Sequence, residues 1–154
     1  MEYALVKWLH ILSSTFLFGT GIGSAFYLLF ATISRDVRAI AVVSRIVVLA
    51  DWLFTSTTVI IQPLTGYMLM RIAGYPLSSP WIAWSVGLYI IAVACWLPVL
   101  WLQMQLKQLA RGAAEGKTAL PAVYWRYFWY WILLGIPAFF SFVAIFYLMV
   151  AKPA

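Results

Sequence analysis

Charged residues are scarce in this chain. Only 9% of its 154 residues are charged, with 4 acidic residues, 1 histidine and 1 cysteine. A soluble domain of this size carries about a quarter charged residues, so the composition argues against an ordinary soluble domain. The single cysteine, Cys95, has no partner for a disulfide within the chain. The sequence also lacks the Walker A, G-x-G-x-x-G, H-E-x-x-H and C-x-x-C patterns, so no nucleotide, zinc or thiol-redox site of these kinds is expected.

Hydrophobic residues dominate the chain, at 66% of the total. They form four long runs, at residues 3–31, 41–72, 81–106 and 122–150. Each run exceeds the ~20 residues that a helix needs to cross the hydrocarbon of a bilayer. Because the connecting segments are short, consecutive helices must pack as antiparallel neighbours. The sequence therefore predicts an all-α polytopic membrane protein: one domain over residues 1–154, built as an up-down bundle of four transmembrane helices.

Lysine and arginine are unevenly divided between the two ends of this expected bundle. One end carries Arg35, Arg38, Arg45, Lys107, Arg111, Lys117 and Arg126. The other end carries Lys7, Arg71 and Lys152. The positive-inside rule places the more basic end in the cytoplasm and both termini outside. The net charge of +6 is thus explained by topology and by contact with the lipid bilayer, and no nucleic-acid partner is expected.

A row of polar side chains runs along the second hydrophobic segment. Its members are Asp51, Thr55, Thr58, Gln62 and Thr65, spaced at steps of four, three, four and three. This spacing places all five on one face of a helix. Because an unpartnered carboxylate in hydrocarbon costs roughly 2.5–3.5 kcal/mol on insertion scales, the face is expected to point toward protein, water or a ligand.

His10, the only histidine, is the first candidate for chemistry. If the first turn centres near Asp36, antiparallel geometry places His10 at the level of Gln62 and, further around the bundle, of Tyr89. These three residues are expected to form one polar cluster near the outer side of the membrane. An imidazole there can ligate iron or another metal through one nitrogen while a neighbour orients the other. The alternative is a histidine whose nitrogens are satisfied by hydrogen bonds alone.

Asp51 is the second candidate, at the cytoplasmic half of its helix. One interpretation is an ion pair with Arg126, since a buried acid usually has a partner. The other is a catalytic carboxyl that exchanges a proton with the cytoplasm along the row Thr55, Thr58 and Gln62.

Three further patterns predict local structure. Pro63, Pro98 and Pro137 lie inside helices and each leaves a carbonyl without its donor, which predicts kinks. The small residues at positions 19, 21, 23 and 24 predict close helix packing within the bundle. The stretch YWRYFWYW at residues 124–131 predicts either an aromatic belt at the interface or a stacking wall for a flat ring.

Four stretches of the sequence form a specific pattern: KWLHILSSTFLFGTGIGSAF, VLADWLFTSTTVIIQPLTGYMLM, GYPLSSPW and ACWLPVLWLQMQL. With them the chain resembles, over nearly its whole length, a bacterial family of four-helix integral membrane proteins, domain-of-unknown-function family twenty-two sixty-nine. The resemblance implies a multi-pass protein of the bacterial inner (plasma) membrane and carries no established activity.

The first helix alone is also similar to HemJ-type protoporphyrinogen oxidases. The shared features are Lys7, His10 three positions later and an apolar run into glycines. Those oxidases are small helical membrane proteins thought to hold haem b through such a histidine, so the resemblance implies His10 as a haem b ligand. Those oxidases also have a basic residue inside a later helix, whereas here the third hydrophobic run has no basic residue before Lys107 at its end. The resemblance is therefore carried over for haem binding only.

Two functions from different classes follow. The first is a redox-type inner-membrane protein that binds haem b or a metal through His10, with Gln62 and Tyr89 beside it and Asp51 as the proton-linked group. The alternative is a non-enzymatic accessory or assembly subunit, as a homodimer or in a larger membrane complex. A small-molecule or ion carrier working as an oligomer is a third possibility. Enzymatic activity is left open.

Overall fold

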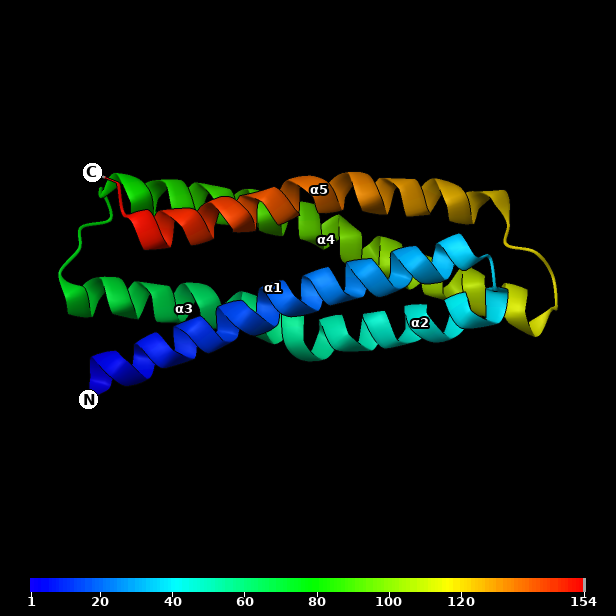
Figure 1. The fold of residues 1–154 in the computed structure, drawn as a ribbon, viewed down its shortest axis with the longest axis horizontal. Helices are drawn as coiled ribbons and strands as arrows, with labels where there is room; N and C mark the ends of the chain where they lie inside the picture. The colour runs from blue at the N-terminus through cyan, green and yellow to red at the C-terminus, as the bar shows by residue number, and fades with distance from the viewer. Residues whose placement is uncertain (154) are drawn as a thin grey trace.

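The computed structural model describes residues 1–153, and in this part of the chain every regular element is helical. The elements are α1 (Glu2–Ser34), α2 (Val37–Ala50), the π-helix η1 (Asp51–Thr55), α3 (Ser56–Ala73), α4 (Pro80–Glu115) and α5 (Ala122–Ala151). Four runs alternate in direction along one long axis: α1, then α2 to α3 as one continuous run, then α4 and α5. Helix α1 begins at the same end of the molecule at which α5 ends (Figure 1). The expected all-α class is confirmed.

The turn from α1 to α2 is short and has a clear local cause. Arg35 takes the left-handed conformation, with φ of 57°, and ends α1. Asp36 then caps α2, because its Oδ1 accepts hydrogen bonds from the backbone N–H groups of Arg38 at 2.9 Å and Ala39 at 3.2 Å. Aspartate at this position satisfies donors that a helix start otherwise leaves free.

The other two connections use residues that stop or start helices. Gly74, with φ of 73°, ends α3 in a conformation that glycine adopts without steric cost. Pro80 then opens α4, where its missing N–H costs nothing. Pro121 precedes α5 in the same way.

The second hydrophobic segment is a helix interrupted by one π-helical turn. The segments α2, η1 and α3 follow one another without a break from Val37 to Ala73. The carbonyl of Asp51 accepts from the backbone N–H of Ser56, five residues on, and from the Ser56 hydroxyl at 3.1 Å. A π-helical turn of this kind is frequent at functional sites, and the sequence reading did not anticipate it.

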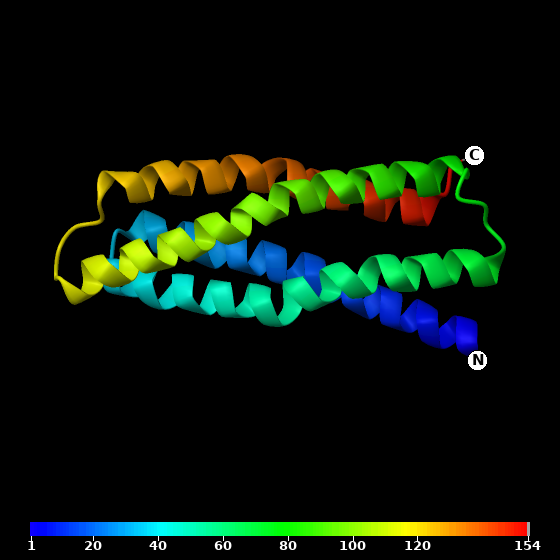
Figure 2. The ribbon, with the colours of Figure 1, turned by 180° about the vertical axis from the view of Figure 1, so that it is seen from behind.

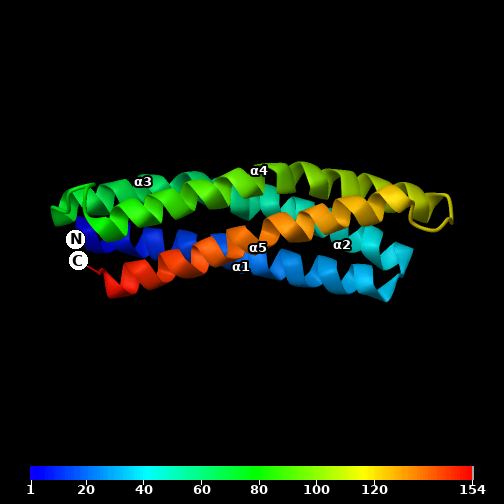
Figure 3. The same ribbon diagram turned by 90° about the horizontal axis from the view of Figure 1, so that it is seen from above.

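The helices form two antiparallel hairpins. The first pairs α1 with α2, η1 and α3, and the second pairs α4 with α5. The hairpins are joined mainly where α2 packs on α4, whereas α1 and α5 meet through Phe18, which packs on Phe139, Phe142 and Phe146. Figures 1 and 2 show the two hairpins close together at the end with the α1–α2 turn and wider apart at the other end. Viewed from above, α5 crosses over α1 near the middle of the molecule (Figure 3).

The buried core lies toward the end with the α1–α2 turn, where the two hairpins are close together, called the closed end below. Its aromatic members are Tyr124, Phe128 and Trp131, which pack with Leu28 and Leu106. Tyr124 also shares a 3.0 Å hydrogen bond with Thr32. The aromatic stretch is therefore divided by face: these three positions, at helical spacing, are core, while Trp129 and Tyr130 are exposed on the outer surface.

Three helices of the described chain are long and apolar enough to cross a membrane, namely α1, α4 and α5. Their outward faces carry large exposed hydrophobic side chains, such as Trp84, Phe140 and Tyr147. Such a surface suits contact with lipid. A fourth crossing by the interrupted segment from α2 to α3, and the placement of both termini outside, remain predictions.

The glycine patch of α1 does not pack as expected. A Cβ atom built on Gly19, Gly21 or Gly23 would meet nothing within 4 Å. The expectation of close helix contact at this patch is therefore wrong. The physical reason is the separation of α1 from α5, which leaves the patch without a facing helix backbone.

Candidate functional site: a polar cluster and an interhelical cavity

His10 lies between α1 and α3, bonded to two residues of the polar row. Its Nδ1 is 2.8 Å from Thr65 Oγ1, and its Nε2 is 3.2 Å from Gln62 Nε2. Ser13, one turn along α1, donates to Gln62 Oε1. The ring also rests on Gly66, where an added Cβ would come within 3.2 Å of His10 Cε1. The depth estimate that placed His10 beside Gln62 is confirmed by this contact.

The hydrogen bonds of this cluster define the tautomer of the imidazole. An amide nitrogen only donates, so Gln62 Nε2 donates to His10 Nε2 and the ring proton lies on Nδ1. That proton is donated to Thr65 Oγ1, whose own hydroxyl donates to the Ile61 carbonyl at 2.8 Å. Every polar atom of the ring and of the Gln62 side chain is thus paired. The cluster links α1 to α3 through hydrogen bonds and leaves no polar atom of these two side chains unpaired.

This arrangement does not fit iron or metal ligation through His10. A metal needs a free nitrogen lone pair on the ring, and the only lone pair here, on Nε2, accepts from Gln62. Among residues 1–153, no group of three or more His, Cys, Asp or Glu side chains could hold a metal ion by itself. Haem b at His10 stays a prediction from the sequence, and ligation would first require Gln62 to release the ring.

Tyr89 is occupied elsewhere. Its hydroxyl donates to the Val59 carbonyl at 2.6 Å. Val59 lies four residues before Pro63, and because proline has no N–H, the Val59 carbonyl has no helical donor. The structure therefore brings His10 and Gln62 together, while Tyr89 satisfies the backbone at the proline.

Asp51 is buried, with 3% of its surface exposed, at the start of the π-helical turn. Its Oδ1 accepts a hydrogen bond from Thr55 Oγ1 at 2.8 Å. The expected ion pair with Arg126 is wrong: in residues 1–153 the structure holds one salt bridge, between Arg111 and Glu115, and Arg126 is exposed. Arg126 lies on the outward face of α5, between the buried positions Tyr124 and Phe128.

The polar row faces inward, as its spacing predicts. Asp51, Thr55, Thr58 and Thr65 are all buried, and Gln62 is partly buried. The row is not, however, a continuous chain of side-chain hydrogen bonds. Thr58 donates to the backbone carbonyls of Phe54 at 2.6 Å and Thr55 at 3.2 Å. Asp51 with Thr55 and the His10 cluster are therefore two separate polar sites.

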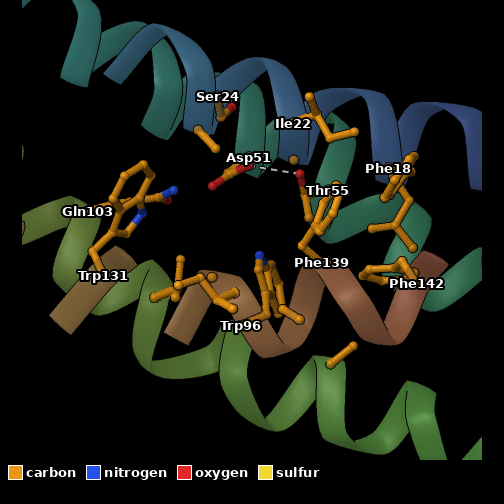
Figure 4. A pocket seen from close by; sticks show the side chains of 18 of the residues that line it. Phe18, Ile22, Ser24, Asp51, Thr55, Trp96, Gln103, Trp131, Phe139 and Phe142 are labelled. Carbon is orange, nitrogen blue, oxygen red and sulfur yellow. Dashed lines mark hydrogen bonds between the residues drawn. The ribbon is translucent and has the colours of Figure 1, made fainter. Parts of the chain in front are cut away.

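Asp51 and Thr55 open onto a cavity of about 430 Å³ in the middle of the bundle. Residues of α1, η1, α3, α4 and α5 line it, and its walls are almost entirely apolar. Figure 4 shows Trp96, Trp131 and Phe139 around the space that Asp51 faces, with Phe18 and Phe142 farther along. Its volume lies within the roughly 300–1,000 Å³ typical of small-molecule sites. His10 is not among the lining residues.

Two polar groups beside this cavity have no partner in the described chain. They are the indole N–H of Trp96 and the Oε1 of Gln103, which is 4% exposed. Native proteins pair the large majority of such atoms. Sequence reasoning missed both residues. Gln103 was the available signal, because it is an uncharged polar residue in an apolar run, four residues before the first basic residue of α4.

Comparison with known proteins gives the class of the chain. A family model described as "Predicted integral membrane protein (DUF2269)" matches residues 4–153. Since the match covers nearly the entire chain, the chain belongs to this family of integral membrane proteins. No match was found among curated proteins or among solved structures.

Proposed function

We propose that this protein crosses the bacterial inner membrane four times and binds a small apolar molecule in its interhelical cavity. The observation that carries the proposal is the cavity itself, an apolar space lined by buried Asp51 and Gln103 and by half-buried Trp96. Buried polar atoms without a protein partner are costly in an apolar medium. A ligand that supplies polar groups to these atoms and fills the remaining volume removes the cost of the unpaired atoms and that of the empty space.

The experiment is to identify what the purified protein carries. Protein in mild detergent is extracted with organic solvent and the extract is analysed by mass spectrometry. The key variant is Gly135→Leu, because Gly135 lines the cavity and a Cβ there meets nothing within 4 Å. Leucine should fill the space without displacing a neighbour.

Gly87→Leu is the matched control, since Gly87 is equally open but lies on the exposed face of α4 outside the cavity. We expect the extract to contain about one molecule of a compound per chain for the native protein and for Gly87→Leu. This compound should be lost in Gly135→Leu. Identical extracts from all three proteins would overturn the proposal.

The same preparation tests the other two functions. A Soret band that disappears in His10→Ala would establish haem b at His10 and contradict the role of that ring as a paired helix contact. A colourless, ligand-free protein that copurifies with another membrane protein would instead support an accessory or assembly subunit.

A further inference from the structure

Asp51 is the only ionisable residue among those that line the cavity. Its carboxyl is hydrogen-bonded by the side chains of Thr55 and Gln103, but no basic side chain in residues 1–153 forms an ion pair with it. Taking a carboxylate without a counter-charge out of water is expensive, and a nearby positive charge offsets much of that cost. The positive charge that Asp51 lacks is therefore best supplied by the ligand.

The surroundings of Asp51 suit a cation and disfavour an anion. Trp96, Trp131 and Phe139 lie around the same space (Figure 4). Aromatic faces attract organic cations that come within about 6 Å of the ring centre. Gln103 adds an unpaired acceptor, Oε1, for an N–H of such a cation, while the unpaired indole N–H of Trp96 requires an acceptor elsewhere on the ligand. A cationic ligand would stabilise the ionised form of the Asp51 carboxyl, and an anionic ligand would be repelled by that form.

The cavity also reaches the surface that faces lipid. Its lining includes Ile22 and Phe26 of α1 and Ile136 and Phe140 of α5, all of which are exposed. Although Phe18 of α1 packs on Phe139 and Phe142 of α5, the exposed lining residues leave the space beside this contact open to the side. A molecule dissolved in the bilayer can enter there, and an apolar tail can extend through the opening.

We propose that the cavity binds a hydrophobic organic cation. Its positively charged nitrogen lies beside Asp51 and Gln103, and its apolar part lies among the aromatic rings toward the opening between α1 and α5. This inference rests on the proposed function and adds the charge of the ligand and its route of entry.

The test compares two probes of the same shape and different charge. They are 4-phenylbutylamine, which is cationic at neutral pH, and 4-phenylbutanol, which is neutral. Binding to the purified full chain in a nonionic detergent is measured by isothermal titration calorimetry. We expect the amine to bind about tenfold more tightly than the alcohol. In Asp51→Asn, which keeps the shape of the side chain, this preference should disappear.

Asp36→Asn is the matched control, because Asp36 is exposed and asparagine also caps a helix. It should keep the full preference for the amine. Equal affinity of the two probes in the native protein, or a preference that survives in Asp51→Asn, would overturn the cation inference.

The two proposals fail in different ways. If both probes bind equally and both are lost in Gly135→Leu, the cavity binds small molecules and only the inference about charge is wrong. If neither probe binds and the solvent extract is also empty, the proposed function itself is wrong.

Discussion

At the scale of single residues, Tyr89 shows how one side chain offsets a break in a neighbouring helix. Pro63 removes the N–H that would bond the Val59 carbonyl, and the Tyr89 hydroxyl from α4 takes its place at 2.6 Å. In a bilayer no water is at hand for such a carbonyl. The proline and the tyrosine therefore form a functional pair, although they lie on different helices.

This pair predicts a dependence that a double-mutant cycle can measure. Tyr89→Phe leaves the Val59 carbonyl unpaired and should lower the free energy of unfolding by about 1–3 kcal/mol. In a Pro63→Ala background the helical N–H returns, so the same Tyr89→Phe change should cost much less. The measurement is denaturant-induced unfolding of the four proteins in the same detergent. Equal costs in the two backgrounds would contradict the assignment.

The sequence predicted the His10–Gln62 contact but not the partners of Asp51 and Tyr89. Counting residues from the hairpin turn gives the depth of each side chain in the membrane, and His10 and Gln62 also lie on adjacent helices that share that turn. For Asp51 and Arg126 depth alone was insufficient, because contact also depends on the rotation of each helix. Arg126 lies on the exposed face of α5, so a shared depth did not produce an ion pair.

At the scale of helices, the π-helical turn Asp51–Thr55 determines where the cavity has its polar side. One extra residue in this turn rotates Asp51 and Thr55 relative to a regular helix, and both point into the cavity. Steps of four and three along the polar row fit a regular helix equally well, so the extra residue leaves no mark on the polar pattern. The order and approximate bounds of the long hydrophobic segments were predictable, since hydrophobic runs and Gly and Pro at the connections define them, whereas the division of the second segment into α2, η1 and α3 was not.

Deleting one residue tests the role of this turn. Leu53 lies in η1 and is 56% exposed, so its removal should convert η1 to a regular helix and keep the faces of α2 and α3 in register. We expect the variant to keep a cooperative thermal transition in detergent and to lose the preference for the cationic probe.

The matched deletion is Ile60, which is 62% exposed in the regular helix α3. Its removal rotates one part of the helix against the other by about 100° and should abolish the cooperative transition. If both deletions behave alike, the π-helical turn has no special role.

At the scale of the whole molecule, the two hairpins meet firmly only at one end. The core of Tyr124, Phe128 and Trp131 closes the end with the α1–α2 turn, and the cavity begins where that core stops. Trp131 belongs to both. The position of the cavity thus follows from how the hairpins diverge, which hydrophobic periodicity cannot reveal because α1, α4 and α5 are apolar on most of their faces.

The orientation of this bundle in the membrane determines whether the polar side of the cavity lies nearer the cytoplasmic or the outer leaflet. The excess of lysine and arginine at the closed end predicts that the α3–α4 connection is outside and the α4–α5 connection is in the cytoplasm. In a Cys95→Ser background, single cysteines at exposed positions, Ser78→Cys and Thr118→Cys, report on these two connections. A membrane-impermeant maleimide should label Ser78→Cys in intact spheroplasts and Thr118→Cys only after permeabilisation.

The cysteine-free Cys95→Ser protein, which must remain unlabelled throughout, is the control for this experiment. Labelling of both positions in intact spheroplasts would mean that α4 does not cross the membrane, and the reverse pattern would invert the bundle. With the expected pattern, Asp51 lies in the inner half of the membrane. It follows Arg45 by six residues, on a helical segment that starts at the cytoplasmic end. A cationic ligand would then reach Asp51 from the cytoplasmic leaflet, whose anionic lipids concentrate such molecules near the surface.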